Sequence, residues 1–377
     1  MLNNNNRLVS EFIELVKIDS ISKNEAKIAK LLLKRLRDLG LEVIIDETAK
    51  EIGGDTGNII ARLKGDVKRF CPVVFVAHMD TVTPGNNVHP QIKEDGRIVS
   101  DGKTILGADD KAGIAALLEA LRFIKENNIP HGDIEIIFTT CEEIGLLGSK
   151  SLDISRLKSK MAFVLDAIGR TGKIITSAPS LRNFKIVIRG KAAHAGANPE
   201  NGINAIKIGG DFLSQISLGR IDEETTANIG IISGGKATNI IPDKVVLKGE
   251  VRSRDNEKIE DYIDKLQETL ENLAKKTNAI TEIEIKKNFD GYKLSSTSPI
   301  VKVAIKAAES IGLRPELCSG GGGTDANIFN EKGILSINLA VGMMNVHTIG
   351  EWIYIEDLER IKKYIIAIVE NFNRNLM

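Results

Sequence analysis

The feature that most constrains the fold is a regular alternation of short apolar runs with longer helical patterns. Two amphipathic patterns, at residues 7–17 and 24–39, open the chain, and another covers residues 111–125. Around them lie apolar runs of strand length, at residues 43–45, 59–63, 73–77, 134–139 and 162–165. This alternation predicts an α/β fold with a mostly parallel sheet that helices cover on both faces.

The rhythm changes in the middle of the chain. From about residue 183 the order becomes strand, helix, strand, strand, helix, strand, at residues 184–188, 203–216, 227–232, 245–251, 258–275 and 280–285. This βαββαβ order forms a small ferredoxin-like α+β sandwich by itself, and the α/β rhythm resumes after residue 292. A chain of 377 residues also exceeds what one compact core usually holds. We therefore predict a discontinuous host domain at 1–180 and 292–377, interrupted by an inserted domain at 181–291.

Composition excludes several classes of partner. Lys and Arg together number 51, as do Asp and Glu, so no net field is available to hold nucleic acid or an anionic membrane surface. The apolar runs are too short to span a membrane, and the polar N-terminus lacks the pattern of a signal peptide. Three cysteines are a poor disulfide framework and suit a reducing cytoplasm, with Cys71 and Cys318 expected as small buried side chains. We expect a cytoplasmic protein with small-molecule partners.

Ligand-type side chains stand where three apolar strands end. His78 and Asp166 each close an apolar run, and Glu142 and Glu143 follow another closely. In open α/β sheets, ligands bind at the carboxyl edge of the strands. We therefore expect these side chains to converge on one cleft, joined by His347, which follows a late strand of the host domain.

Each pattern has an ordinary interpretation beside the chemical one. Asp80 lies two residues after His78 on the same side of an extended segment, so it can accept the second N–H of the imidazole, although His-x-Asp often arises by chance. Asp109 and Asp110 precede a helix and are typical of a helix N-cap, but a carboxylate at such a turn can also bridge two cations.

The adjacent Glu142 and Glu143 would repel each other unless a cation or a shared proton compensates. Because neighbouring side chains diverge, one can bind a metal while the other serves as a general base toward water. The ordinary alternative is a pair of solvated loop acids. Asp109, Glu143 and Asp166, with a shared hydroxide, would balance the charge of two divalent ions. Mixed nitrogen and oxygen ligands suit zinc and also accept cobalt or manganese.

Taken together, these residues resemble the M20 family of metallopeptidases, most closely its peptidase T (tripeptidase) branch. The matching motifs span nearly the whole chain in order: 78–82 (HMDTV), 106–113 (LGADDKAG), 142–145 (EEIG), Asp166 and 347–348 (HT). The resemblance makes the host domain the catalytic, metal-binding domain and implies roles for seven residues: His78 and Asp166 on one ion, Glu143 and His347 on the other, Asp109 bridging, Asp80 orienting His78, and Glu142 as the catalytic base.

The resemblance also makes the inserted domain a lid that commonly forms a homodimer. It implies that His194 helps to stabilise the developing oxyanion, often from the neighbouring subunit, and that Arg252 binds the C-terminal carboxylate of the substrate. A loop histidine and a solvated arginine are the alternatives, and Arg254 could exchange roles with Arg252. Asn239 resembles a substrate contact and is otherwise an ordinary turn residue.

The glycine-rich run at residues 320–325 resembles the substrate loop of the family. Backbone N–H groups at Gly322 and Gly323 can approach a carboxylate there. The run lacks the Gly-Lys-Ser/Thr ending of a nucleotide loop, which argues against ATP binding.

The predicted function is hydrolysis of short peptides, most simply release of the N-terminal residue of tripeptides. A deacylase of N-acyl amino acids or a dipeptidase with the same dinuclear site is the nearest alternative. A peptide-binding relic without activity is disfavoured by the intact ligand set and Glu142. A hydrolase with Cys141 as nucleophile would be sensitive to thiol reagents and indifferent to chelators, which is the opposite of a metal enzyme.

Overall fold

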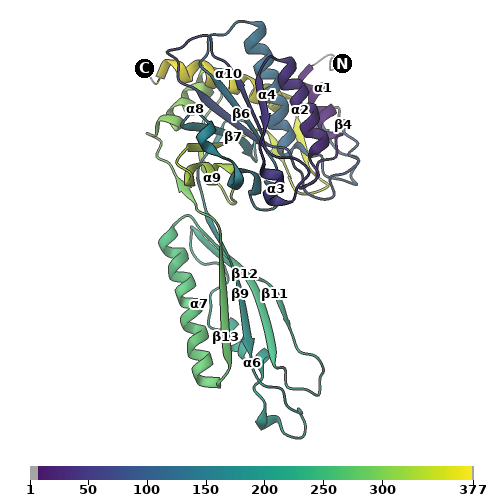
Figure 1. The fold of residues 1–377 in the computed structure, drawn as a ribbon, viewed down its shortest axis with the longest axis vertical. Coiled ribbons are helices and arrows are strands. Elements are labelled where there is room, and N and C mark those ends of the chain that lie inside the picture. Colours follow the sequence, from purple (N-terminus) through teal and green to yellow (C-terminus); the bar gives the residue numbers. More distant parts are fainter. Residues whose placement is uncertain (1–6, 376–377) are drawn as a thin grey trace. The chain divides into compact units, whose positions relative to one another are not determined.

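A computed structural model describes residues 7–375, so the polar N-terminus discussed above lies outside the described residues. The chain forms two compact units (Figure 1). Unit 1 comprises residues 7–177, 294–320 and 324–375, and unit 2 comprises Ala178–Lys293 with Gly321–Gly323. The insertion predicted at 181–291 lies within unit 2, and its boundaries stay a prediction. Within residues 7–375, no helix is long and apolar enough to cross a membrane.

Unit 1 is built on a sheet with a parallel centre. Its strand order is β1-β2-β6-β3-β7-β16-β8, with β15 beside β8. The pairs β6·β3, β3·β7, β7·β16 and β8·β15 are parallel, whereas β1·β2, β2·β6 and β16·β8 are antiparallel. The strands are β1 (Glu42–Ile45), β2 (Ile59–Leu63), β3 (Val73–His78), β6 (Ile134–Thr139), β7 (Met161–Ala167), β8 (Lys173–Ala178), β15 (Glu316–Ser319) and β16 (Leu335–Ala340).

Helices pack around this sheet, and the longer ones share one apolar core with it. The helices of a first group pack against one another, and a second group consists of short helices. The first group is α1 (Arg7–Val16), α4 (Ala108–Glu126), α8 (Pro299–Ser310) and α10 (Ile355–Asn375); the second is α3 (Thr48–Ile52), α5 (Leu147–Ser151) and α9 (Asp325–Glu331). In the second group, α9 packs against β7 and β16, α5 packs against α9, and α3 packs against α5. Another helix, α2 (Ala26–Asp38), packs beside β1 and β2. The α/β prediction for this part of the chain is confirmed.

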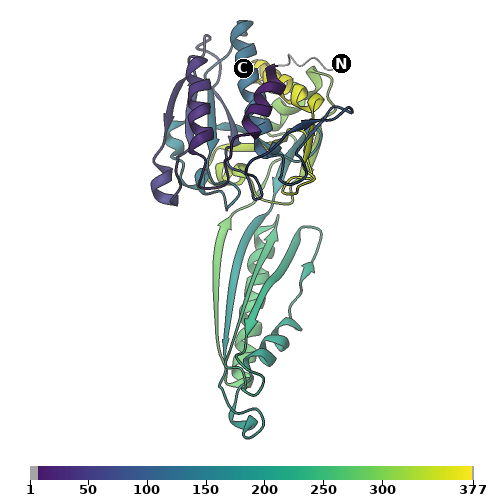
Figure 2. The ribbon, with the colours of Figure 1, turned by 90° about the vertical axis from the view of Figure 1, so that its right-hand side faces the viewer.

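Unit 2 has the predicted α+β order. An antiparallel sheet, β10-β11-β12-β9-β13, carries α6 and α7 on one face (Figures 1 and 2), where Phe184, Leu247 and Leu266 lie in the core. The elements are β9 (Ser180–Arg189), α6 (Ala205–Leu213), β10 (Gly219–Arg220), β11 (Thr225–Gly234), β12 (Lys244–Ser253), α7 (Asn256–Thr277) and β13 (Ile280–Phe289). In β9, the alternate residues Phe184, Ile186 and Ile188 belong to the core that this sheet shares with the helices.

Several features differ from the sequence prediction, among them the unpredicted strands β8 and β15 of the main sheet. A small antiparallel sheet joins strands of two or three residues, too short for a periodic signal: β4 (Gln91–Ile92), β5 (Arg97–Val99), β17 (Met343–Met344) and β18 (Trp352–Tyr354). The expectation that Cys71 and Cys318 are buried is wrong, because Cys71 is exposed and Cys318 is partly exposed, and only Cys141 lies in the interior.

Candidate metal centre

Strand ends and one helix start bring the predicted ligands together in unit 1. His78 is the last residue of β3, and Asp166 is the second last of β7, its parallel neighbour. Asp109 lies at the start of α4, where Asp109 and Asp110 have non-helical backbone angles. Gly113 allows this helix to approach β7 closely, because a Cβ there would lie 2.5 Å from the carbonyl oxygen of Leu165. The close approach carries Asp109 toward the strand ends.

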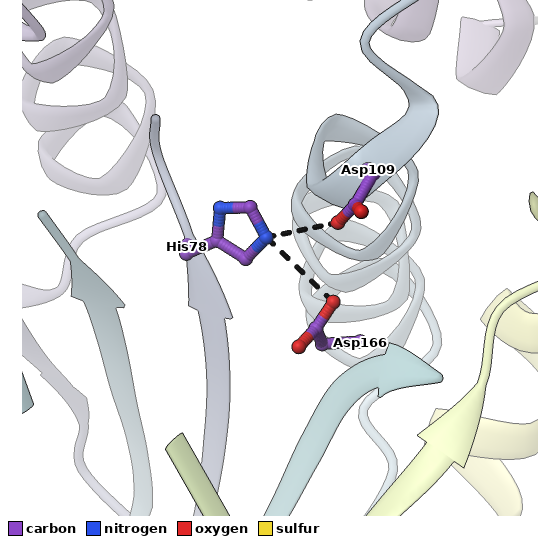
Figure 3. Close-up of side chains that lie close together, drawn as sticks. All are labelled: His78, Asp109 and Asp166. Atoms are coloured by element: carbon purple, nitrogen blue, oxygen red, sulfur yellow. Dashed lines mark hydrogen bonds and ion pairs between the residues drawn. The ribbon is translucent and has the colours of Figure 1, made fainter. Parts of the chain in front are cut away.

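Three of these side chains form a buried group (Figure 3). Nε2 of His78 lies 2.9 Å from Oδ1 of Asp109 and 3.6 Å from Oδ1 of Asp166. One ligand atom of each residue lies within 4.8 Å of the other two. The three residues are buried, and the His78 side chain is only 2% exposed. We call His78, Asp109 and Asp166 the buried triad.

A second group shares Asp109 and is more open. Nε2 of His347 lies 3.0 Å from Oε1 of Glu143 and 3.2 Å from Oδ2 of Asp109. The His347 side chain is 51% exposed, and its ligand atom also lies within 4.8 Å of the other two. We call Asp109, Glu143 and His347 the open triad. Asp109 thus turns one carboxylate oxygen toward each histidine, the arrangement that a carboxylate between two cations requires.

The charges of this cluster fit two divalent ions. Burial, followed by the nearby Asp109 carboxylate, raises the pKa of Asp166 to about 8. Burial also raises the pKa of Glu143. Such shifts arise where carboxylates are crowded without enough positive charge. Two ions would supply that charge, and imidazole with carboxylate oxygens is a donor set that zinc, cobalt or manganese accepts.

Asp80 holds the backbone of the acidic pair. Its Oδ1 accepts the backbone N–H of Glu142 at 2.9 Å, and its Oδ2 accepts the N–H of Glu143 at 3.2 Å and the hydroxyl of Ser22 at 2.6 Å. Nδ1 of His78 lies 2.9 Å from the Asp80 carbonyl oxygen and 3.4 Å from its Oδ1. The shortest contact between His78 and Asp80 therefore involves the backbone of Asp80, while the Asp80 carboxylate binds the backbone of Glu142 and Glu143.

Glu142 lies in the same cluster with a carboxyl group suited to take up a proton. It is buried, and burial followed by the charge of Asp166 raises its pKa well above the usual range. Asp325 adds to this rise. Asp325 itself is buried at the start of α9 and accepts a 2.6 Å hydrogen bond from Thr139, at the end of β6. A general base works best when its pKa lies near the working pH, and an upward shift moves a carboxyl group in that direction.

Two further buried acids support the ligand loops, and sequence reasoning did not find them. Oε1 of Glu25 accepts the hydroxyl of Thr140 at 2.7 Å and the N–H of Cys141 at 2.9 Å. Cys141 has a left-handed backbone (φ 52°), a conformation that costs free energy in a non-glycine residue, so the grip of Glu25 stabilises the turn before Glu142. The carboxylate of Glu351 accepts the backbone N–H groups of Gly107 and Asp109. No local pattern marks either acid, because each acts on a segment far away in the sequence.

In unit 2, two predicted substrate residues lie side by side. A β-bridge joins His194 to Ile240, and the N–H of Ala195 donates to the carbonyl oxygen of Asn239 at 3.0 Å. The His194 side chain is exposed, and its Nδ1 accepts the backbone N–H of Ala197 at 3.0 Å. This bond leaves Nε2 of His194 as the nitrogen directed away from its own loop.

The other predicted substrate residues of unit 2 also lie together. A Cβ on Gly322 would lie 3.8 Å from Nη1 of Arg252, and one on Gly323 would lie only 2.1 Å from the ring of Phe289. Glycine is therefore required at position 323, where the loop lies against the ring of Phe289. Arg252 is paired with the carboxylate of Glu250 at 2.9 Å, on a partly exposed surface.

Comparisons with known proteins agree with this geometry. Two family models match the chain, one described as a peptidase dimerisation domain over residues 176–278 and one as peptidase family M28 over residues 58–219. The protein YqjE of Bacillus subtilis is 46% identical over 97% of this chain and 98% of its own length. The crystal structure of aminopeptidase PepT from Bacillus cereus is 46% identical, covers 97% of this chain and 98% of its own, and superposes with a TM-score of 0.93. A tripeptidase from Staphylococcus aureus is 38% identical, with 98% of both chains covered and a TM-score of 0.94.

Proposed function

This chain belongs to the M20 family of metallopeptidases, in its peptidase T-like branch, and we propose that it releases the N-terminal residue of tripeptides with two zinc ions. The proposal rests mainly on the carboxylate of Asp109, whose Oδ1 lies beside His78 and whose Oδ2 lies beside His347. A site for two ions side by side suits hydrolysis of an amide bond. The relatives named PepT and tripeptidase support peptides of this length.

In this proposal the five ligands divide as the two triads do. His78 and Asp166 would hold one ion, Glu143 and His347 would hold the other, and Asp109, which belongs to both groups, would serve both. When bound, the ions supply Lewis-acid polarisation of the peptide carbonyl and acidify water. Asp80 keeps the Glu142–Glu143 turn in place through its hydrogen bonds to both backbone N–H groups.

Glu142 acts in this proposal as the general base. Its raised pKa suits a group that accepts a proton from the attacking water and then passes it to the leaving amine. Glu142→Ala should retain both ions and lose turnover by about a hundredfold or more. Wild-type turnover in this variant would remove Glu142 from the mechanism.

The lid residues support a dimeric active site. Arg252 pairs with Leu181 at one end of β9, whereas His194 follows Arg189 at the other end. At about 3.3 Å per residue, these two ends of β9 lie roughly 26 Å apart. A fully extended tripeptide spans only about 11 Å. If His194 and Arg252 both contact substrate, they therefore reach one peptide from two different subunits.

The edge of β11 is the surface that we assign to this homodimer. β10 pairs only with Thr226 and Ala227, so β11 has no strand partner on that side from Asn228 onward among the described residues. Ile231 and Ile232 are exposed there, at 54% and 55%. An exposed apolar edge strand is a template for pairing with a second chain, and it falls inside the matched dimerisation domain.

A mixing experiment tests the shared site. Glu142→Ala and His194→Ala subunits are purified separately, mixed, dissociated and reassembled. If His194 acts across the dimer, the mixture recovers about a quarter of wild-type turnover, since half of the dimers then carry one complete site. If it acts within one chain, no activity returns, and Ile231→Lys should leave turnover unchanged despite producing monomers.

A substrate panel tests the reaction itself. Di-, tri- and tetrapeptides and N-acyl amino acids are offered to the enzyme before chelation, after chelation and after zinc, cobalt or manganese is restored. The proposal expects cleavage only at the N-terminal residue of tripeptides, lost on chelation and regained with metal. Preferred cleavage of N-acyl amino acids or dipeptides would instead assign one of those activities to the same site. The cytoplasmic location stays a prediction.

A further inference from the structure

Glu351 is a buried acid that stands close in sequence to a ligand of the open triad. It lies four residues after His347, just before β18, and is 1% exposed. Its own backbone N–H donates to the carbonyl oxygen of Thr348 at 3.1 Å, which closes a tight turn next to His347. The position of Glu351 is therefore coupled to the position of His347.

The carboxylate of Glu351 grips the loop that carries Asp109. Its Oε2 accepts the backbone N–H of Gly107 at 2.7 Å, and its Oε1 accepts the N–H of Asp109 at 3.0 Å. Both oxygens are used, on donors more than two hundred residues away. Gly107 has a left-handed backbone (φ 76°) and no side chain, so it cannot cap α4 itself.

The two hydrogen bonds to Glu351 affect the orientation of Asp109 as well as the capping of α4. Asp109 has an extended backbone angle (ψ 104°), so the helix does not fix its side chain. On the other side, the carboxylate of Asp110 accepts the N–H of His78 at 3.2 Å. The segment around Asp109 is thus held at two points. The carboxylate of Glu351 accepts the N–H of Asp109, and the carboxylate of the next residue, Asp110, accepts the N–H of His78 in β3.

We infer that Glu351 is a positioning residue for the open triad, setting Asp109 and His347 at ion-binding distance from each other. The inference rests on the two-ion site proposed above. The buried triad has supports of its own, because His78 ends a central strand and the N–H of Asp166 is bonded to Asn338 at 2.9 Å. The buried triad shares Asp109 but has two further ligands held independently of Glu351, so loss of Glu351 should weaken the ion site of the open triad more than that of the buried triad.

The test measures the binding of each ion separately. Demetallated wild type, Glu351→Gln and Glu351→Ala are titrated with zinc by calorimetry and with cobalt by its visible spectrum. Glutamine keeps the size of the side chain but turns one NH₂ group toward a backbone N–H, so one of the two bonds is lost. We expect the weaker of the two ions to bind about 10- to 100-fold less tightly, as for other residues that orient ligands, and the tighter ion to be affected clearly less.

Controls separate positioning from a general loss of structure. Glu356→Gln removes an exposed acid from the same region, whose partners are Arg170 and Arg360, and should bind both ions as wild type does. Excess zinc should restore turnover of Glu351→Gln with its KM for peptide unchanged. If Glu351→Ala does not fold, Glu351→Gln decides the question.

Two outcomes would overturn the inference. Wild-type affinity for both ions in Glu351→Gln would show that Glu351 does not position the ligands, as would equal weakening of both ions. Failure of the wild type itself to bind two ions would instead remove the site on which the inference rests, so the two failures are distinguishable.

Discussion

The two halves of the metal centre differ in their exposure to solvent. The buried triad is almost closed, with its histidine 2% exposed, whereas the open triad contains a histidine that is 51% exposed. The first sits on neighbouring parallel strands, and the second relies on turns after β6 and after β17. On the proposed two-ion site, we therefore expect an ion at the open triad to exchange more easily than an ion at the buried triad.

The largest expected effect follows from His78→Ala in the buried triad. This change leaves the carboxylates of Asp109 and Asp166 buried without their imidazole partner, which is strongly unfavourable. We expect loss of both ions, loss of turnover and a lower melting temperature. Metal analysis and thermal unfolding of the purified variant measure this, and retention of two ions would contradict the assigned role of the buried triad.

A smaller effect is expected from His347→Ala in the open triad. Water can take the place of an exposed imidazole, so the protein should fold normally and keep the ion of the buried triad. Metal analysis should then find about one ion per chain, since three donors remain at the buried triad. Loss of both ions together would show that the two triads do not act separately.

The lid provides the next comparison. Arg252→Ala removes a guanidinium that we assign to the substrate carboxylate, a charged hydrogen bond of about 1.5–3 kcal/mol. We expect KM for tripeptides to rise about 10- to 100-fold, while metal content and kcat stay close to wild type. Lys248→Ala, on the same strand, serves as the control. An unchanged KM would assign the carboxylate to another group, Arg254 first.

The smallest effect lies outside both triads. Nζ of Lys332 donates to the carbonyl oxygens of Ser149, Lys150 and Leu152, tying the end of α9 to α5. Lys332→Met should lower the free energy of unfolding by about 1–3 kcal/mol, because buried carbonyl groups lose their donor. Metal content should not change, and Lys302→Met, at an exposed position, should be neutral. Loss of one ion from Lys332→Met would show that the contact between α9 and α5 also supports the metal centre.

Sequence patterns located most of the elements that position the site. The apolar run at 73–77 became β3, and helical backbone angles begin after Asp110, where the amphipathic pattern begins. The βαββαβ order of the insertion was also correct, apart from the additional two-residue strand β10 between α6 and β11. These features are local: periodicity, strand-end side chains and turn residues all act within a few positions of one another.

The supporting contacts could not be predicted because they join distant segments. Glu25 and Glu351 carry no motif, and their partners lie more than a hundred residues away. The grip of Asp80 on Glu142 depends on a turn whose left-handed residue, Cys141, has no sequence signature. The exposure of His347 likewise follows from how its turn sits on the sheet. The roles of the individual site residues stay predictions.

Anomalous diffraction from crystals soaked in zinc tests the central claim most directly. We predict two peaks on each chain, both within bonding reach of Asp109, one also touching His78 and Asp166 and the other Glu143 and His347. A single peak, or zinc bound elsewhere while the enzyme is active, would contradict the account.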